Sequence, residues 1–86
     1  MSVYLASYDL LHHKEMADYE RLIAELRKLG AQKALFSDWV LRNDATSQQL
    51  REHLRQFMHA DDRLLVAEIS TTNWASWKLL IDINKV

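Results

Sequence analysis

The residue best placed for chemistry in this sequence is Asp9, which closes the apolar run at residues 3–10. In that run β-branched and aromatic side chains alternate with smaller ones, which is typical of a buried β-strand. A strand keeps its backbone rigid while its last residue reaches solvent, so a carboxylate there has a fixed position. Mg²⁺ prefers carboxylate oxygens and needs few protein ligands, because it keeps several waters. Asp9 is therefore a candidate metal ligand; the alternative is a cap for the loop or helix that follows.

Histidine, serine and tryptophan residues supply further candidate groups. His12 and His13 follow Asp9 closely enough to act as a general acid or base, unless they lie in a solvated loop. Ser37 could bind a phosphate or orient Asp9, although a serine in a strand more often satisfies a neighbouring backbone group. Trp39 could stack on a base, whereas a lone aromatic residue in a strand usually belongs to the core or to a dimer interface.

A basic patch is the third candidate. Arg51 and Arg55 are one helical turn apart and Arg42 comes shortly before them, so the three could contact phosphates of a nucleic acid. The alternative is an ordinary solvated face, because surface helices carry such pairs routinely. His53 and His59 lie six positions apart on the same predicted helix, nearly on opposite sides, so we do not expect them to form a paired metal site.

Composition limits the classes of function. The chain has 86 residues, 49% of them apolar, which predicts one domain over residues 1–86 with a core small enough for dimerisation to add burial. A net charge of −1 argues against a surface covered with nucleic acid, though not against a local basic face. The absence of cysteine excludes disulfides, thiolate zinc sites and a cysteine nucleophile. With no membrane-length apolar run and no signal peptide before the first strand, we expect a cytoplasmic protein and no membrane partner.

Periodicity predicts the first elements that must position these residues. Apolar side chains at a spacing of three to four predict a helix over residues 15–29, and Gly30 supplies the left-handed residue that ends it. Residues 31–42 read as extended chain, either one bent strand or a tight pair of strands. Thr46 and Gln49 fit a capping box, which predicts a second helix through about residue 58.

The last third of the chain combines a clear strand with an ambiguous tail. Arg63–Ile69 has the composition of a strand, and residues 74–86 suit either a helix or a strand. We expect a short helix in the tail, capped by Thr72 or Asn73. With right-handed crossovers, the predicted order of elements gives an α+β ferredoxin-like sandwich, in which two helices cover one face of an antiparallel sheet.

Several motifs resemble a known family, the small CRISPR-associated spacer-acquisition proteins of the Cas-two family. Its first strand typically ends in a Tyr-Asp pair, as does Tyr4-Leu5-Ala6-Ser7-Tyr8-Asp9. Its Ser-x-Phe motif is matched by Ser37-Asp38-Trp39. An uncharacterised bacterial and phage branch, often labelled SinR-like, is more similar still, through Phe36-Ser37-Asp38-Trp39, Asp62-Arg63-Leu64-Leu65-Val66 and Trp74.

The resemblance implies a ferredoxin-like homodimer in which the Asp9 residues of two protomers face each other near the twofold axis. In some family members these aspartates bind a divalent metal and support phosphodiester cleavage, and in others the dimer only scaffolds DNA. We therefore predict an Mg²⁺-dependent endonuclease that acts on DNA or RNA. The alternative is a non-catalytic dimeric module that binds nucleic acid or a protein partner, such as a product of the same operon. The residues assigned to these roles are Asp9 as metal ligand and catalytic residue, Ser37 as catalytic helper, Arg42, Arg51 and Arg55 as nucleic-acid contacts, and Trp39 at the dimer interface.

Overall fold

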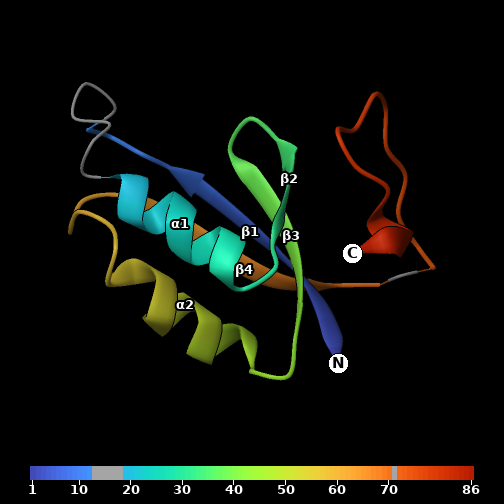
Figure 1. The fold of residues 1–86 in the computed structure, drawn as a ribbon, viewed down its shortest axis with the longest axis horizontal. Helices are drawn as coiled ribbons and strands as arrows, with labels where there is room; N and C mark the ends of the chain where they lie inside the picture. The colour runs from blue at the N-terminus through green and yellow to red at the C-terminus, as the bar shows by residue number, and fades with distance from the viewer. Residues whose placement is uncertain (13–18, 71) are drawn as a thin grey trace.

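The computed structural model describes residues 1–12, 19–70 and 72–86. The fold is a four-stranded antiparallel sheet with α-helices on one face (Figure 1). The strand order is β2-β3-β1-β4. This is the predicted α+β ferredoxin-like sandwich. The elements are β1 (Ser2–Asp9), α1 (Glu20–Lys28), β2 (Gln32–Leu35), β3 (Asp38–Asn43), α2 (Ser47–Arg55), β4 (Arg63–Ile69) and the 3₁₀ helix η2 (Ile83–Lys85).

Strand β1 is central, and its register fixes the position of Asp9. It pairs with β3 as far as the rung between Ser7 and Asp38. Its ladder with β4 continues further, to the rung between Asp9 and Arg63. Asp9 therefore occupies the last rung of the β1–β4 ladder, two residues beyond the last pair of β1 with β3.

The sheet face under α1 and α2 forms the main core. Strand residues alternate, so every second side chain points towards the helices. Burying a leucine or an aromatic side chain contributes about 1.5–3 kcal/mol relative to leaving it exposed, so this layer dominates the stability of the fold. Its buried members are Tyr4, Ala6, Tyr8, Tyr19, Leu22, Leu26, Ala31, Trp39, Leu41, Leu50 and Leu54.

The opposite face of the sheet is covered only in part by the C-terminal tail. A second cluster joins Ile83 of the tail to Val3, Ala34 and Val40, with Leu79 and Ile81 packed against it. The rest of that face, which we call the open face, carries Ser7, Asp9, Arg63 and Leu65, as the register of β1 and β4 requires. Leu65 is 59% exposed there, so the open face presents an apolar side chain next to the Asp9 carboxylate.

Local signals in the sequence account for most element boundaries. Gly30 has φ +81°, which confirms the left-handed residue after α1. Thr46 and Gln49 form the predicted reciprocal capping box at the start of α2. Residues 32–43 form a tight pair of strands joined at Phe36 and Ser37, which decides between the two alternatives. The predicted beginning of the first helix, residues 15–18, lies outside the described residues.

Two predicted helical segments are corrected. Helix α2 ends at Arg55 and not near residue 58, because Phe57 and Met58 donate to carbonyls three positions back in a tightened turn. His59 is consequently not on the helix. No helix begins after Thr72 or Asn73 in the part of the tail that the structure describes, which contains only η2, capped by Asp82.

The physical reason for the tail's conformation is its packing. Leu79, Ile81 and Ile83 are spaced two apart, and all pack in the cluster that covers part of the sheet face opposite the helices. The backbone N–H of Leu80 donates to the carbonyl of Ala34 at 3.1 Å, which ties the tail to β2. Lys78, with φ +53°, is incompatible with a continuous helix. Among the described residues, no helix has the length and apolar character to cross a membrane.

Candidate functional site

Asp9 is accessible at the end of β1. Its side chain is 67% exposed, and Oδ2 lies 3.7 Å from Nη1 of Arg63, which is 74% exposed. Ion pairs between exposed groups contribute little to stability and exchange readily with solvent. The carboxylate is therefore rigid at its backbone and open at its oxygens, as a metal ligand requires.

Ser37 lies in the β2–β3 turn, beside the end of β1. Its backbone carbonyl accepts a hydrogen bond from the N–H of Tyr8 at 3.2 Å, which ties the β2–β3 turn to the end of β1. Asp9 and Ser37 line one cavity of about 500 Å³, and its remaining wall is mostly apolar. That wall is made by Tyr8, Leu10, Leu11, Ile23 and Phe36. A cavity of this kind suits a ligand with a flat apolar part and a polar group at the Asp9 end.

Asp38 is a neighbour of Asp9 to which we had assigned no role. It pairs with Ser7, so it lies on the same face of the sheet as Asp9 and diagonally across from it. Diagonal cross-strand neighbours are separated by about 7–8 Å. The signal was present in the alternation of β3, where Trp39 points to the helices and Asp38 to the other side.

Trp39 is part of the core. It is 2% exposed, and its Nε1–H donates to the hydroxyl of Tyr8 at 2.9 Å. Burial raises the pKa of Tyr8, and the hydrogen bond from Trp39 opposes that rise only in part. A side chain this well covered by its own chain has little surface left for a partner, so its position favours the core alternative over the dimer interface.

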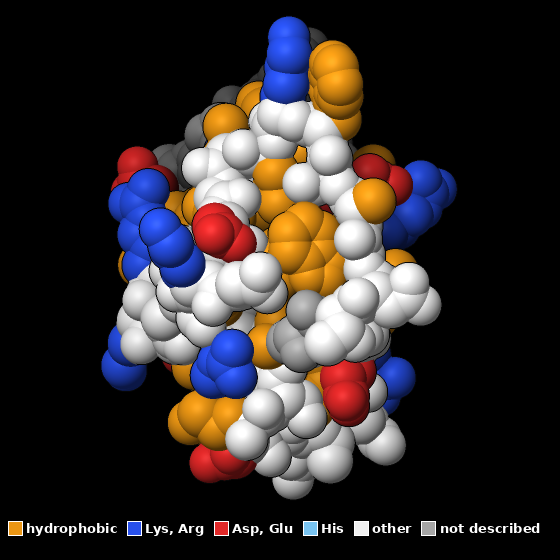
Figure 2. Space-filling model, turned by 90° about the vertical axis from the view of Figure 1, so that its right-hand side faces the viewer, with side chains coloured by type: hydrophobic (Ala, Val, Ile, Leu, Met, Phe, Trp, Pro, Cys, Tyr) orange, Lys and Arg blue, Asp and Glu red, His pale blue; other side chains and the backbone are white. Residues whose placement is uncertain are grey.

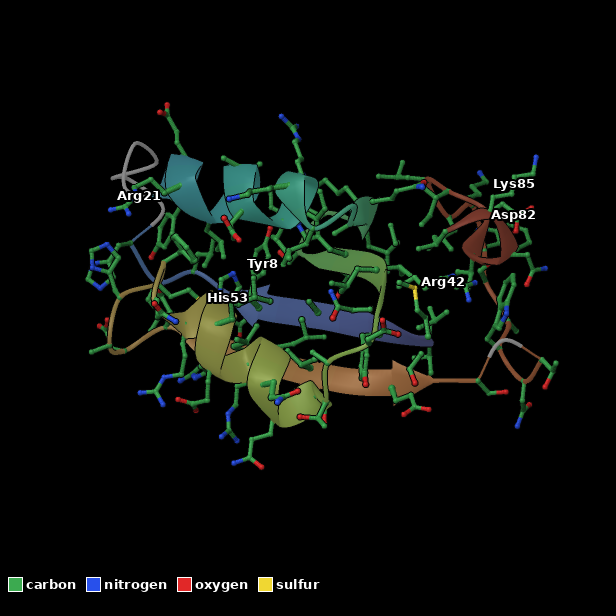
Figure 3. All side chains as sticks on the ribbon, turned by 60° about the horizontal axis from the view of Figure 1, so that its bottom comes forward. Tyr8, Arg21, Arg42, His53, Asp82 and Lys85 are labelled. Carbon is green, nitrogen blue, oxygen red and sulfur yellow. The ribbon has the colours of Figure 1, made fainter. Side chains whose placement is uncertain are left out.

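The three arginines do not form one patch. Arg51 and Arg55 both bind Glu52, at 2.9 and 3.2 Å, and their hydrogen bonds lower the pKa of Glu52. Arg42 is on the tail side of the molecule, where its Nε donates to the backbone oxygen of Val86 at 3.0 Å (Figure 3). Only Arg51 and Arg55 therefore remain together as a candidate phosphate contact.

A second group of polar side chains lies just beyond the last rung of β1 and β4, and it is centred on Asp62. Oδ1 of Asp62 accepts from the backbone N–H of Leu11 at 2.8 Å, and Oδ2 accepts from that of His59 at 2.9 Å. The hydroxyl of Tyr19, 2.8 and 2.9 Å from the two oxygens, also donates to this carboxylate. Burial alone would raise the pKa of Asp62, but these donors outweigh it and lower the pKa.

His12 and Asp61 complete this group, which we call the histidine–aspartate cluster (His12, Asp61 and Asp62). His12 Nε2 lies 2.8 Å from Asp61 Oδ1, and this hydrogen bond lowers the pKa of Asp61. One ligand atom from each of the three residues lies within 4.8 Å of the others. The sequence analysis predicted His12 as a candidate acid or base and assigned no role to Asp61 or Asp62.

The remaining histidines differ in their surroundings. His53 Nε2 lies 2.7 Å from Glu25 Oε1, which joins α2 to α1 in the layer seen in Figure 3. The ring of His59 lies 4.2 Å from that of His12, centroid to centroid, next to the histidine–aspartate cluster. His13 lies outside the described residues.

No protein-family model matches this chain, and no solved structure shows a significant match to it. The ferredoxin-like fold therefore rests on strand order and register alone. Since one fold can carry many functions, function has to be argued from the sites themselves.

Proposed function

We propose that this chain is a Cas-two-like, Mg²⁺-dependent endonuclease that works as a cytoplasmic homodimer on the phosphodiester bonds of DNA or RNA. One observation carries the proposal. The Asp9 carboxylate is exposed at the rigid end of the central strand, on the half of the sheet that the tail leaves uncovered. A functional carboxylate has to be both fixed and accessible, and Asp9 combines the two.

The need for a dimer follows from the charges around Asp9. One chain offers this carboxylate together with the cationic Arg63 at 3.7 Å, which is a poor site for a cation. A second Asp9 across a twofold axis would give the ion a second carboxylate ligand. Leu65, which is 59% exposed on the open face, gives two copies an apolar surface on which to meet. Hydrophobic side chains are also exposed at the tail end of the molecule, amid mostly polar groups (Figure 2).

Four residues near the end of β1 have distinct tasks in this proposal. A bound Mg²⁺ would activate a water molecule and neutralise charge on the phosphate. Asp9 would hold the ion, and the Ser37 hydroxyl, which lines the same cavity, would donate to a phosphate oxygen. Arg63, once Asp9 binds the ion, contacts a neighbouring phosphate. Phe36, 88% exposed, offers a flat surface to a base.

Asp9→Asn is the direct test, because asparagine keeps the size of the side chain and removes its charge. Cleavage of single- and double-stranded DNA and RNA is measured with Mg²⁺, with Mn²⁺ and with EDTA. We expect a loss of about a hundredfold or more in rate, since the variant cannot hold the ion. The matched control is Glu68→Gln, which neutralises an exposed carboxylate of β4 opposite Tyr4, far along the ladder from Asp9. Cleavage that persists in Asp9→Asn or in EDTA would contradict the proposal.

A non-catalytic dimeric scaffold is the second candidate, and the Asp9–Arg63 ion pair favours it. In that case the carboxylate already has its cationic partner within the chain, and Asp9 orients Arg63 towards nucleic acid or protein. Binding of nucleic acid by the wild-type protein, with no cleavage under any metal, would support this candidate over the nuclease.

A further inference from the structure

We infer that the histidine–aspartate cluster is a binding site for one divalent transition-metal ion, complete within a single chain. The inference is independent of the proposed nuclease site, which needs Asp9 and a second protomer. Its three side chains come from the segment after β1 and the turn before β4, brought together by the β1–β4 ladder.

The geometry of the three side chains suits a small ion. Zinc binds histidine nitrogen and carboxylate oxygen at about 2.0–2.2 Å, which separates tetrahedral ligands by about 3.3–3.6 Å. The three ligand atoms already lie within 4.8 Å of one another, and His12 Nε2 and Asp61 Oδ1 are 2.8 Å apart. Asp61 is 64% exposed, so its side chain has room to rotate to the distance that an ion needs.

Asp62 has room for an ion beside its existing hydrogen bonds. A carboxylate offers about four acceptor positions. Counting only donors among the described residues, Asp62 receives one hydrogen each from Leu11 N–H, His59 N–H and Tyr19 O–H, which leaves one position. The same donors fix the orientation of the carboxylate, as outer-sphere hydrogen bonds do in metal sites. The cluster is therefore preorganised at Asp62 and adjustable at Asp61.

The set of ligand atoms selects the kind of metal. Imidazole nitrogen suits zinc and its first-row neighbours, whereas Mg²⁺ favours oxygen ligands and water. One nitrogen and two carboxylate oxygens therefore favour Zn²⁺ or Co²⁺ over Mg²⁺. Three protein ligands also leave one coordination position open to water or to a phosphate oxygen.

Binding should stabilise the folded chain. His12 and Asp61 are 49 residues apart, so the unfolded chain does not present the site. An ion that binds the folded state and not the unfolded state raises the midpoint of thermal unfolding. This gives a readout that does not depend on any enzymatic activity.

The test is a titration of the metal-free protein with Zn²⁺, followed by calorimetry and by thermal unfolding, with Co²⁺ absorption as a spectroscopic check. We expect one ion per chain, and at least tenfold weaker binding in Asp61→Asn and in His12→Gln. Asp62 is left intact because its hydrogen bonds hold the surrounding loops. Mg²⁺ at the same concentration should leave the unfolding temperature unchanged.

His53→Gln is the matched control, because His53 also binds a carboxylate, Glu25 at 2.7 Å, but lies on α2. Its Zn²⁺ affinity should equal that of the wild type. The inference is overturned if Asp61→Asn and His12→Gln bind Zn²⁺ as tightly as the wild type, or if the wild type does not bind. Asp9→Asn should keep full Zn²⁺ affinity, so the failure of either proposal leaves the other open to its own test.

Discussion

Asp9 and Asp62 carry the same carboxylate group at the same end of the β1–β4 ladder, yet they differ in exposure and in hydrogen bonding. Asp9 is 67% exposed and has Arg63 at 3.7 Å as its ion-pair partner. Asp62 is half-buried and accepts hydrogen bonds from Leu11, His59 and Tyr19. The first carboxylate is open to a ligand, and the second already holds the two loops together.

The difference comes from where each residue stands relative to the strands. Asp9 is still within β1, so nearby backbone donors are used by the ladder and its side chain faces solvent. Asp62 immediately precedes β4, where the loop N–H groups of Leu11 and His59 have no strand partner and need an acceptor. Asp9 is thus accessible, whereas the carboxylate of Asp62 is held in place by donors from the adjoining loops.

Removing Asp62 should have the largest effect on stability. Asp62→Ala leaves two backbone N–H groups and the Tyr19 hydroxyl without their acceptor, so we expect a loss of about 3 kcal/mol in the free energy of unfolding. Urea denaturation in EDTA measures it. Asp9→Ala is the control and should change the free energy by less than about 0.5 kcal/mol, as surface substitutions usually do. Equal losses in the two variants would remove the distinction between the two carboxylates.

The paired arginines should matter for binding and hardly for stability. Because Arg51 and Arg55 are exposed and share Glu52, replacing both by alanine should change the free energy of unfolding by under about 1 kcal/mol. If they contact phosphates, the salt dependence of nucleic-acid binding should flatten by a slope of about 1.8. Arg42→Ala is the comparison, since Arg42 lies with the tail at Val86. An unchanged slope in the double variant would assign Arg51 and Arg55 to a solvated face.

Much of the fold could be predicted because its signals are local. The strand at Arg63–Ile69, the left-handed Gly30 and the Thr46–Gln49 capping box each depend on neighbouring residues only. The tail could not be predicted, because its apolar spacing fits both helix and strand. The conformation of the tail depends on its tertiary contacts with Val3, Val40 and Ala34 on the sheet.

The two candidate sites also differ in how far local sequence signals could predict them. Asp9 could be predicted as a candidate because it ends a recognisable strand. Asp61 and Asp62 were missed because they meet His12 only through the register of β1 with β4, across 49 positions of sequence. Extending the antiparallel pairing beyond Asp9 and Arg63 would have brought these segments together. For Trp39, the residue type alone was compatible with either a dimer interface or the core. Its burial on the helix-covered face of the sheet places it in the core.

The central claim is that the open face of two chains brings their Asp9 carboxylates together, and a single cysteine tests it most directly. The chain has no cysteine, so Leu65→Cys places one thiol on the open face and Ala24→Cys places one on the exposed side of α1. Both proteins are treated with a short bis-maleimide at micromolar concentration. We predict that Leu65→Cys gives a covalent dimer and Ala24→Cys stays monomeric. Equal cross-linking of the two, or none in Leu65→Cys, would contradict the shared site.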